Sequence, residues 1–424
     1  MSARAPVDVC IITAGHLSTC PRMVKAADAL AFAGYHVHVV STCYLEWGEA
    51  ADAELLRQRG GAWGSTVVRF DWARGAAARA WSALRVRAAR QAARLVGTSH
   101  LPLAIAARGF GRFHSELLRA ARAVPARLYY GGTAAGLAVA EAASRDRGVP
   151  FALDLEDFHS AEQDDCAAAR RSHALIRRIE SQILRSAAFC TAGSQAMADE
   201  YHATYRVRPT PIHNTFPLPE RAPDLSQDPQ RGLRIYWFSQ TVGPGRGLED
   251  AIVATGLAGI RGELHLRGVP VPGYINRLQR LIAERAPQVG MTHHLPATPD
   301  PVDLCRGYDV GLALEQTHVR NRELCLTNKS LTYPLAGLAV VYTDTPGQRP
   351  LALDLGEGAL LVRPGDITAF AEGLRRWVND RALLARAKSA AWKAARRRWH
   401  WEHANERGAL LGLMKETLGA RRIA

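Results

Sequence analysis

Short apolar segments alternate with longer amphipathic segments along the first half of the chain. Residues 7–13, Val-Asp-Val-Cys-Ile-Ile-Thr, have the density of β-branched side chains that is typical of a buried parallel strand. A helical stretch at 21–33 ends at a glycine, and a strand at 36–41 completes a βαβ unit. Further strands are predicted at 66–70, 127–130, 151–155 and 188–192, with helices between them, notably at 166–186. This alternation predicts an α/β fold with a doubly wound parallel sheet.

The same alternation restarts after residues 217–232, which contain four prolines and few apolar side chains. Predicted elements there are strands at 233–238, 263–267, 291–295, 310–314 and 338–342, a helix from Leu248, and long helices after Asp366. We therefore predict two Rossmann-like domains that face each other across a cleft, which would hold the ligand site at the carboxyl ends of the strands. The predicted boundaries are an N-terminal domain at 1–216, a linker at 217–232, a C-terminal domain at 233–400, and a helix at 401–424 that crosses back to the first domain.

Composition narrows the class of protein. The 424 residues are 47% hydrophobic and 22% charged, which excludes a disordered or fibrous chain. No apolar run approaches the roughly 20 residues that span a bilayer. The first residues lack the apolar core of a secretory signal, and the seven cysteines are scattered without metal-site spacing. These features predict a cytoplasmic protein with reduced thiols and no metal.

A strongly basic stretch stands out from a chain whose formal net charge is +14. Residues 73–122 contain ten arginines and one acid, Glu116, with bulky apolar residues such as Trp81, Leu84 and Leu95 interleaved. Such a helical insert suits the surface of an anionic membrane, and the alternative is a solvated helical face beside a core face. Nucleic-acid binding is disfavoured because no recognised motif for it accompanies the charge.

Two segments of the second half have features of an anion site. Gly243-Pro-Gly-Arg246-Gly lies between a strand and a helix, where glycines let the backbone approach a phosphate and Arg246 adds charge. Asn328-Lys329 begins a helix just before a buried strand, in a chain that has only five lysines among its 54 basic residues. The alternative for each segment is a purely structural turn or helix cap.

A third polar segment closes a strand of the first half. The sequence there is Asp154-Leu-Glu156-Asp157-Phe-His159-Ser160. Carboxylates and an imidazole at the carboxyl end of a strand can hold sugar hydroxyls or move a proton, whereas the structural alternative is a capped turn.

In order and spacing these segments resemble the GT-B glycosyltransferases, close to the family-four branch (glycosyl transferases group 1), over about residues 7–400. The first similar segment is Gly15-His16-Leu-Ser-Thr-Cys-Pro-Arg-Met-Val-Lys, and the second is 238–247 with its glycine turn. The third, Asn328-Lys329 through Tyr333 to Gly337 and Val340, is similar to the family pattern N-K-x-x-E-Y-x-x-x-G-x-P-V.

The chain departs from the family at its pair of glutamates. The positions that match the two family glutamates are occupied by Leu324 and Thr332, neither of which is acidic. Ala339 replaces the usual proline. Glu315 and Glu323 are also eight residues apart, but they come nine residues too early to be the family pair, and only a shifted loop would place Glu315 in the cleft.

The resemblance implies a metal-independent, hexosyltransferase-like enzyme that moves a sugar from a nucleotide-diphosphate donor, a UDP- or GDP-sugar, to an acceptor hydroxyl with retention and without a covalently bound cofactor. The catalytic residues are then predicted to be His159, Arg246 and Lys329, the donor-binding residues Gly15, Gly243, Asn328, Thr332 and Tyr333, and the acceptor or sugar contacts His16, Glu156 and Asp157.

The expected partners are the nucleotide sugar, a saccharide or lipid-linked acceptor in surface polysaccharide or glycolipid synthesis, and an anionic membrane surface that contacts 73–122. The protein would then be peripheral at the inner face of the membrane. Two alternatives stay open: a sugar-nucleotide-binding or scaffold protein that has lost catalysis, and a GT-B nucleotide-sugar epimerase.

Overall fold

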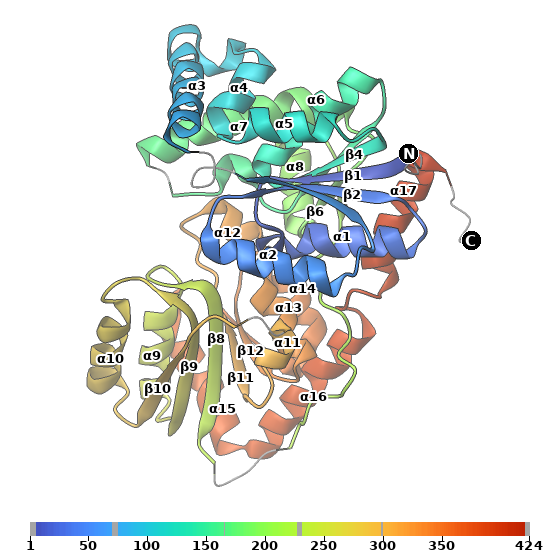
Figure 1. Cartoon of the computed structure of the whole chain (residues 1–424). Helices are drawn as coiled ribbons and strands as arrows, with labels where there is room; N and C mark the ends of the chain where they lie inside the picture. The colour runs from blue at the N-terminus through green and yellow to red at the C-terminus, as the bar shows by residue number, and fades with distance from the viewer. Residues whose placement is uncertain (1–5, 70–74, 165, 227–230, 298–299, 420–424) are drawn as a thin grey trace. The chain divides into compact units, whose positions relative to one another are not determined.

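The computed structural model describes residues 6–69, 75–164, 166–226, 231–297 and 300–419. The chain divides into two compact units (Figure 1). Unit 1 comprises residues 1–213 together with 407–424, and unit 2 comprises residues 214–406. Each unit is built on one parallel sheet, as the alternation of apolar and amphipathic segments predicts.

Unit 1 has a seven-stranded sheet in the order β3-β2-β1-β4-β5-β6-β7. Its strands are β1 Val7–Thr13, β2 Val37–Cys43, β3 Gly64–Arg69, β4 Ala126–Gly132, β5 Phe151–Leu155, β6 Cys190–Ala192 and β7 Thr210–Pro211. Its α-helices are α1 Pro21–Phe32, α2 Glu46–Gln58, α3 Gly75–Val96, α4 Leu103–Phe110, α5 His114–Arg122, α6 Ala134–Arg147, α7 Ala167–Ile183, α8 Gln195–Tyr205 and α17 Ala409–Leu418. Figure 1 shows α1 and α2 on one face of this sheet and α5 and α6 on the other, so the sheet is covered on both sides.

Unit 2 has a six-stranded sheet in the order β10-β9-β8-β11-β12-β13. Its strands are β8 Leu233–Val242, β9 Gly262–Pro270, β10 Val289–His294, β11 Val310–Ala313, β12 Ala339–Thr343 and β13 Ala359–Val362. Its α-helices are α9 Leu248–Leu257, α10 Tyr274–Arg285, α11 Pro301–Leu304, α12 Arg320–Leu324, α13 Asn328–Leu335, α14 Arg349–Leu355, α15 Ile367–Asn379 and α16 Arg381–Arg397. One core cluster packs α9, α10 and α15 on one face of the sheet, and a second packs α11, α13, α14 and the end of α16 on the other.

Each sheet has one point at which its strand order reverses. In unit 1 the reversal lies between β1 and β4, which pair through Val9 and Leu128. In unit 2 it lies between β8 and β11, which pair through Ile235 and Val310. The loops that leave such neighbouring strands diverge to opposite faces, and the crevice outside their carboxyl ends is the usual ligand site of an open α/β sheet.

The sequence prediction of the elements is confirmed with two omissions. The predicted strands appear, and the helix from Leu248 and the long helices after Asp366 are present. The strands β7 and β13 were not predicted: β7 has two residues, one of them a proline, and β13 is a partly exposed four-residue strand. Among the helices that the structure describes, none is both long and apolar enough to cross a lipid bilayer.

The division of the chain differs by several residues from the boundaries expected from composition. The proline-rich segment belongs to unit 2, where Phe216 joins the core and Pro223 and Leu225 pack against Gly337; residues 227–230 lie outside the described part. The last helix, α17, packs against α1 in unit 1, and the chain enters that unit at residue 407.

Candidate functional site

A glycine turn leaves β8 at the strand reversal of unit 2. A Cβ atom at Gly243 would lie 2.9 Å from Val271 Cγ2, so the backbone approaches its neighbour closely there. Gly247 has φ +71° and is the N-cap of α9, which begins at Leu248. The turn therefore presents the N-terminus of α9 at the carboxyl end of β8, as predicted.

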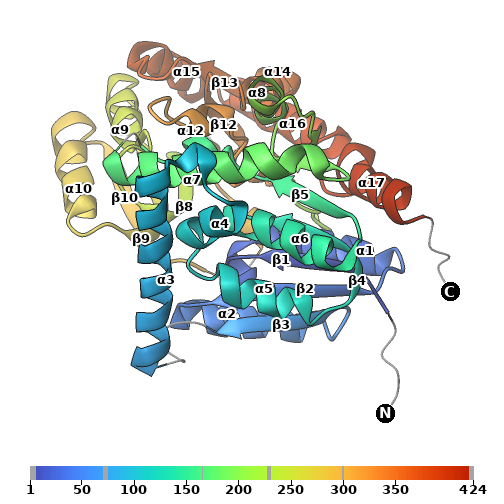
Figure 2. The same ribbon diagram turned by 90° about the horizontal axis from the view of Figure 1, so that it is seen from above.

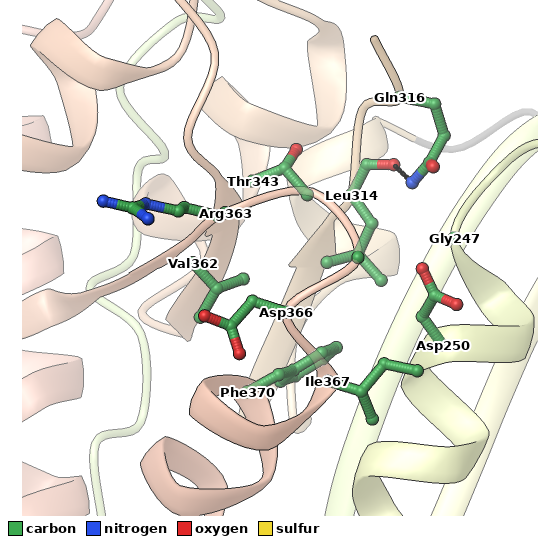
Figure 3. Close-up of a pocket in the computed structure, with 11 residues that line it drawn as sticks. Gly247, Asp250, Leu314, Gln316, Thr343, Val362, Arg363, Asp366, Ile367 and Phe370 are labelled. Carbon is green, nitrogen blue, oxygen red and sulfur yellow. Dashed lines mark hydrogen bonds between the residues drawn. The ribbon is translucent and has the colours of Figure 1, made fainter. Parts of the chain in front are cut away.

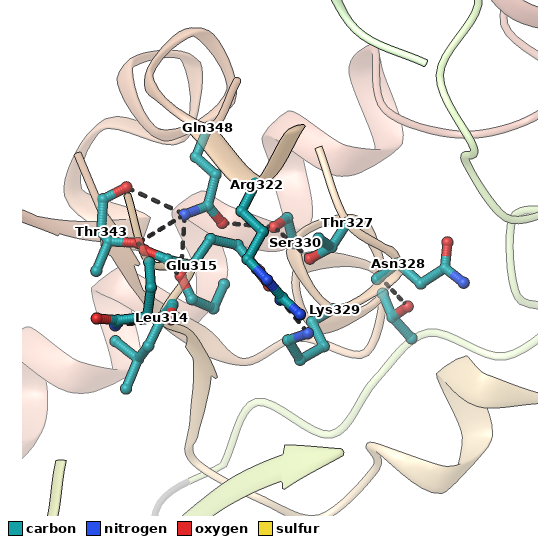
Figure 4. A network of polar contacts seen from close by, with 12 residues as sticks. Leu314, Glu315, Arg322, Thr327, Asn328, Lys329, Ser330, Thr343 and Gln348 are labelled. Carbon is teal, nitrogen blue, oxygen red and sulfur yellow. Dashed lines mark hydrogen bonds and ion pairs between the residues drawn. The ribbon is translucent and has the colours of Figure 1, made fainter. Parts of the chain in front are cut away.

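A buried carboxylate lies at the end of the neighbouring strand, β11. Glu315 is 3% exposed, and its Oε1 is 3.0 Å from Lys329 Nζ. Its Oε2 is 3.3 Å from Nη1 of Arg322 on α12. Figure 4 shows both cationic side chains directed at this one carboxylate. We call these three residues together with Arg246 the Glu315 cluster.

The charges of the Glu315 cluster explain its pKa shifts. Burial alone would raise the pKa of Glu315, but the charges of Lys329, Arg322 and Arg246 outweigh burial and lower it. The pKa of Arg246 is lowered, first by burial and then by the like charge of Arg322. Two cations thus contact one carboxylate and the charge of a third, Arg246, also acts on it, which leaves an excess of positive charge suited to a further anion.

Lys329 is held in place by its surroundings. It lies in the first turn of α13, is 7% exposed, and its Nζ lies 5.7 Å from the centroid of the buried Trp237 ring. An ammonium over an aromatic face gains further electrostatic stabilisation. The cation is therefore preorganised before any ligand arrives.

A polar network behind the cluster fixes the end of β11. Nε2 of the buried Gln348 donates to the carbonyls of Ala313 and Thr343, at 3.0 and 3.1 Å. Ser330 Oγ donates to Gln348 Oε1 at 2.7 Å, and Thr343 Oγ1 donates to the carbonyl of Glu315 at 2.7 Å. These bonds join β11, β12 and α13, so the backbone that carries Glu315 is fixed relative to Lys329.

The other predicted donor residues of unit 2 lie beside or behind the cluster. Asn328 Oδ1 accepts a hydrogen bond from Asn214 Nδ2 at 2.8 Å. Thr332 is fully buried, and its hydroxyl donates to the carbonyl of Asn328 within the same helix. Tyr333 is also fully buried and packs edge-on against Phe238. Direct contact of Thr332 and Tyr333 with a ligand stays a prediction, and in this structure both side chains belong to the interior of unit 2.

A small cavity lies under the glycine turn (Figure 3). Gly247, Leu314 and Gln316 line one side of it, and Arg363, Asp366 and Phe370 are among the residues on the other. Its volume is about 10 Å³, which is room for about one water molecule.

We expect Gly247→Ala to lower the free energy of unfolding by about 2–4 kcal/mol, because alanine disfavours the positive φ and its Cβ would lie 2.8 Å from Leu314 Cβ. Gly259→Ala is the matched control, since Gly259 has φ +67° with open space around it. Urea unfolding should show a loss of only about 1–2 kcal/mol for the control. Equal losses in the two variants would contradict the close packing.

The strand reversal of unit 1 carries Gly15 and His16 just after β1. A Cβ atom at Gly15 would lie 2.8 Å from Cys20 Sγ. His16 is completely buried, and its Nδ1 lies 3.3 Å from Asp52 Oδ2. Its Nε2 accepts from the amides of Tyr44 and Leu45, at 3.3 and 3.2 Å. In this structure His16 therefore secures the start of α2, and its contact with a sugar stays a prediction.

His159 is the other histidine of interest in unit 1. It is 4% exposed, and its Nδ1 lies 3.4 Å from Glu162 Oε2. Burial by itself lowers the pKa of His159, but the hydrogen bond and charge of Glu162 outweigh burial and raise it to about 9. Among the described residues, none forms a hydrogen bond with His159 Nε2. A buried imidazolium N–H without an acceptor can donate to a ligand.

Glu156 and Asp157 follow β5 next to a buried ion pair. Arg22 Nε and Nη2 lie 2.6 and 2.7 Å from the two oxygens of Asp154, which ties α1 to β5. Burial raises the pKa of Glu156 to about 7, and the charge of Asp157 adds to this rise while that of Arg22 opposes it. Asp154, within β5, is thus a structural residue, whereas Glu156, just after the strand, is a partly exposed carboxyl that titrates near neutral pH.

This raised pKa predicts a pH-dependent effect of Glu156→Gln. Because the folded pKa lies above the ordinary value of 4.5, the stability that Glu156 contributes is full below about pH 4.5 and is lost as the pH rises through about 7. The shift corresponds to at most about 3 kcal/mol, which solvent screening reduces. We expect the variant to be stabilised relative to the wild type at pH 8 but not at pH 4.5, as measured by thermal unfolding. Glu46→Gln, at the exposed start of α2, is the control, and a pH-independent difference for Glu156→Gln would contradict the prediction.

Comparison with known proteins gives matches in structure only. No protein-family model and no curated protein matches the amino-acid sequence. Sucrose-phosphate synthase from Thermosynechococcus elongatus matches with a TM-score of 0.69 and 14% identity, over 98% of this chain and 100% of that chain. Anabaena HepE in complex with UDP matches with a TM-score of 0.63 and 15% identity, over the same shares. Staphylococcus aureus TarM, in complex with UDP and α-GlcNAc-glycerol, matches with a TM-score of 0.62 and 9% identity, over 97% of this chain and 99% of that chain.

These matches extend over both units, and the order of strands in each sheet agrees with the predicted doubly wound arrangement. The chain therefore has the GT-B fold of glycosyltransferases.

Proposed function

We propose that this protein is a glycosyltransferase that moves a sugar from a nucleotide-diphosphate donor to an acceptor hydroxyl. The observation that carries the proposal is the Glu315 cluster at the strand reversal of unit 2, in which Lys329 and Arg322 contact the carboxylate and the charge of Arg246 also lowers its pKa. A cluster with excess positive charge at a helix N-terminus and a glycine turn fits a diphosphate. The GT-B fold and the UDP present in the HepE and TarM structures support the same interpretation.

The donor's diphosphate would bind to Lys329, Arg322 and Arg246, with Gly243 and Asn328 lining the approach. As the bond between the sugar and the β-phosphate breaks, negative charge develops on the departing phosphate oxygen. Cations that are already in place stabilise this charge without reorganising. Three such side chains support a mechanism that needs no metal ion.

The nucleotide is proposed to be UDP, with GDP as the second choice. HepE has been crystallised with UDP-glucose, and the match covers 98% of this chain and 100% of the HepE chain. Calorimetry with UDP and GDP decides between the two bases.

Unit 1 would supply contacts to the transferred sugar or to the acceptor. His159 would donate its Nε2 proton in a hydrogen bond to a sugar hydroxyl, and Glu156, whose pKa is raised to about 7, would accept one. Asp157 and Gly15 would shape the approach from the same unit. Retention of the anomeric configuration and a role in surface polysaccharide or glycolipid synthesis, with a saccharide or lipid-linked acceptor, complete the proposal.

A second candidate is a sugar-nucleotide-binding protein without catalysis. It is favoured by Thr332, which stands where the family pattern N-K-x-x-E-Y has a glutamate and whose hydroxyl is bonded to its own helix. This candidate predicts tight donor binding with no product.

The proposal is tested first by calorimetric titration with UDP, GDP, ADP and dTDP. The protein is then incubated with the matching radiolabelled sugar nucleotides and a membrane extract as acceptor. Binding of one nucleotide and acceptor-dependent product support it. Binding without product favours the second candidate, and an isomerised sugar nucleotide formed without acceptor favours an epimerase. No binding of any nucleotide at about 1 mM would refute the proposed donor site.

A further inference from the structure

The helix α3, in the basic stretch of unit 1, has a packed face made of small side chains. Ser82 and Ala89 are its buried residues, and the helix packs against α4. Arg85 pairs with Glu116, and Arg90 Nε donates to the carbonyl of Gly109 at 3.0 Å. This face therefore packs within unit 1, so the other faces of α3 point away from that packing.

The bulky apolar side chains of α3 lie on a different face, away from this packing. Trp81, Leu84 and Leu95 are 60%, 54% and 77% exposed. They follow one another at helical spacings that place them on a single stripe, with Ala77 and Ala88 on the same line. We call Trp81, Leu84 and Leu95 the apolar stripe of α3. The sequence leaves two alternatives for this stretch, a membrane-facing surface and a solvated face beside a core face. In α3 the core face consists of small residues, and the large apolar side chains are exposed.

Two arginines lie along one side of the apolar stripe. Arg87 and Arg94 are exposed, and within the described part of the chain neither forms an ion pair. The sequence contains no acidic residue between Asp71 and Glu116, so carboxylates within this stretch do not neutralise them. Arg74, also in the basic stretch, lies outside the described residues.

The apolar stripe and the two arginines together indicate the chemistry of the surface that binds this face of α3. A stripe of Trp and Leu beside unneutralised arginines matches a surface that is apolar beneath a layer of negative charge, which is an anionic lipid bilayer. At 22 residues, α3 would extend about 33 Å along that surface. Figure 2 shows α3 as one straight helix, so the stripe and the arginines can contact a flat surface together.

We propose that α3 docks unit 1 on an anionic membrane, with the apolar stripe inserted among the lipids and Arg87 and Arg94 at the level of the phosphates. The inference deepens the proposed function and rests on it in one respect, because a membrane-bound enzyme would meet a lipid-linked acceptor. Docking itself does not depend on sugar transfer, so the two can fail separately.

Flotation with vesicles tests the docking. We expect the full chain to float with vesicles of equal phosphatidylcholine and phosphatidylglycerol and to stay at the bottom with phosphatidylcholine alone. Trp81→Ser/Leu84→Ser should lower the partition coefficient at least tenfold. Phe32→Ser is the matched control, since Phe32 is 80% exposed on α1 and lies outside the stripe. Arg87→Gln/Arg94→Gln should lower it about 25-fold, at about fivefold for each charge, whereas Arg208→Gln/Arg280→Gln, two exposed arginines elsewhere, should lower it far less.

Several results would overturn the docking. One is equal flotation with neutral and anionic vesicles, and another is unchanged flotation of the stripe and arginine variants. Binding to duplex DNA in place of vesicles, or a dimer that the stripe variant converts to monomer without any vesicle binding, would assign α3 to another occupant. Circular dichroism and UDP calorimetry on the same variants show whether they fold and keep the donor site, which separates failure of docking from failure of the proposed function.

Discussion

Replacing Lys329 with alanine is expected to lower kcat/KM for sugar transfer by about 10²–10³-fold, the usual effect of removing one preorganised group that stabilises developing charge. Lys329 is the cation closest to Glu315, and the Trp237 ring and the first turn of α13 hold its ammonium in place. Because the charge on the leaving diphosphate increases as the glycosidic bond breaks, most of the loss should appear in kcat and a smaller part in the affinity for UDP. Steady-state kinetics and calorimetry on the same preparation measure the two parts.

The matched control for this prediction is Lys393→Ala. Lys393 is exposed on α16, so its removal takes away the same charge from a site outside the cluster. The control should keep wild-type kinetics. Loss of UDP affinity with unchanged kcat in Lys329→Ala would mean that the lysine binds substrate and transition state equally, which contradicts a role in stabilising the leaving group.

The elements of this fold could be predicted because the sheets are parallel and buried. Strands covered on both faces are short continuous apolar runs, as in 7–13, where β1 runs from Val7 to Thr13. The glycine turn could also be predicted, since a positive φ at Gly247 and the start of α9 both leave a local sequence signal. Local signals of this kind do not depend on the rest of the chain.

The Glu315 cluster could not be predicted from spacing alone. Spacing argues against Glu315 because it stands nine residues before the family register, and only a shifted loop would place it in the cleft. In the structure the loop after β11 and the helix α12 bring Arg322 and Lys329 back to it, 7 and 14 residues along the chain. Loop conformation, which decides this, has no periodic signal. A weaker sign was present: Glu315 directly follows a buried strand, where a charge is unusual without a partner.

For the apolar face of α3 the sequence leaves two alternatives, an exposed face and a core face, and it does not decide between them. An amphipathic pattern normally turns its large apolar side chains inward, but here Ser82 and Ala89 pack inward and Trp81 stays out. The contact with α4 and the pair of Arg85 with Glu116 of α5 decide which face is inside. The pattern identified two faces, and the tertiary packing assigned them.

Glu315→Gln is expected to lower the free energy of unfolding by about 3 kcal/mol, the usual effect of removing one partner of a buried ion pair. The substitution keeps the shape of the side chain but leaves Lys329, Arg322 and Arg246 without a counter-charge. Because the pKa of Glu315 is lowered from 4.5, its stabilising contribution is present above that value and is lost as the pH falls through the folded pKa. The difference between variant and wild type should therefore be full at pH 7 and should shrink in acid, as measured by urea unfolding.

A diphosphate would supply the negative charge that the variant lacks, so UDP should raise the Tm of Glu315→Gln more than that of the wild type and bind about tenfold more tightly, which corresponds to about 1.4 kcal/mol. Glu323→Gln is the matched control, since Glu323 lies eight residues away and pairs with the exposed Arg320, a contact worth about 1 kcal/mol or less. It should change neither stability nor UDP binding appreciably. Weaker UDP binding in Glu315→Gln would mean that the carboxylate positions the cations for the diphosphate, and equal binding would place the nucleotide away from the cluster. The UDP affinity of Glu315→Gln thus distinguishes two roles of the carboxylate: it either occupies the position that a phosphate would take, or it positions the cations that bind the diphosphate.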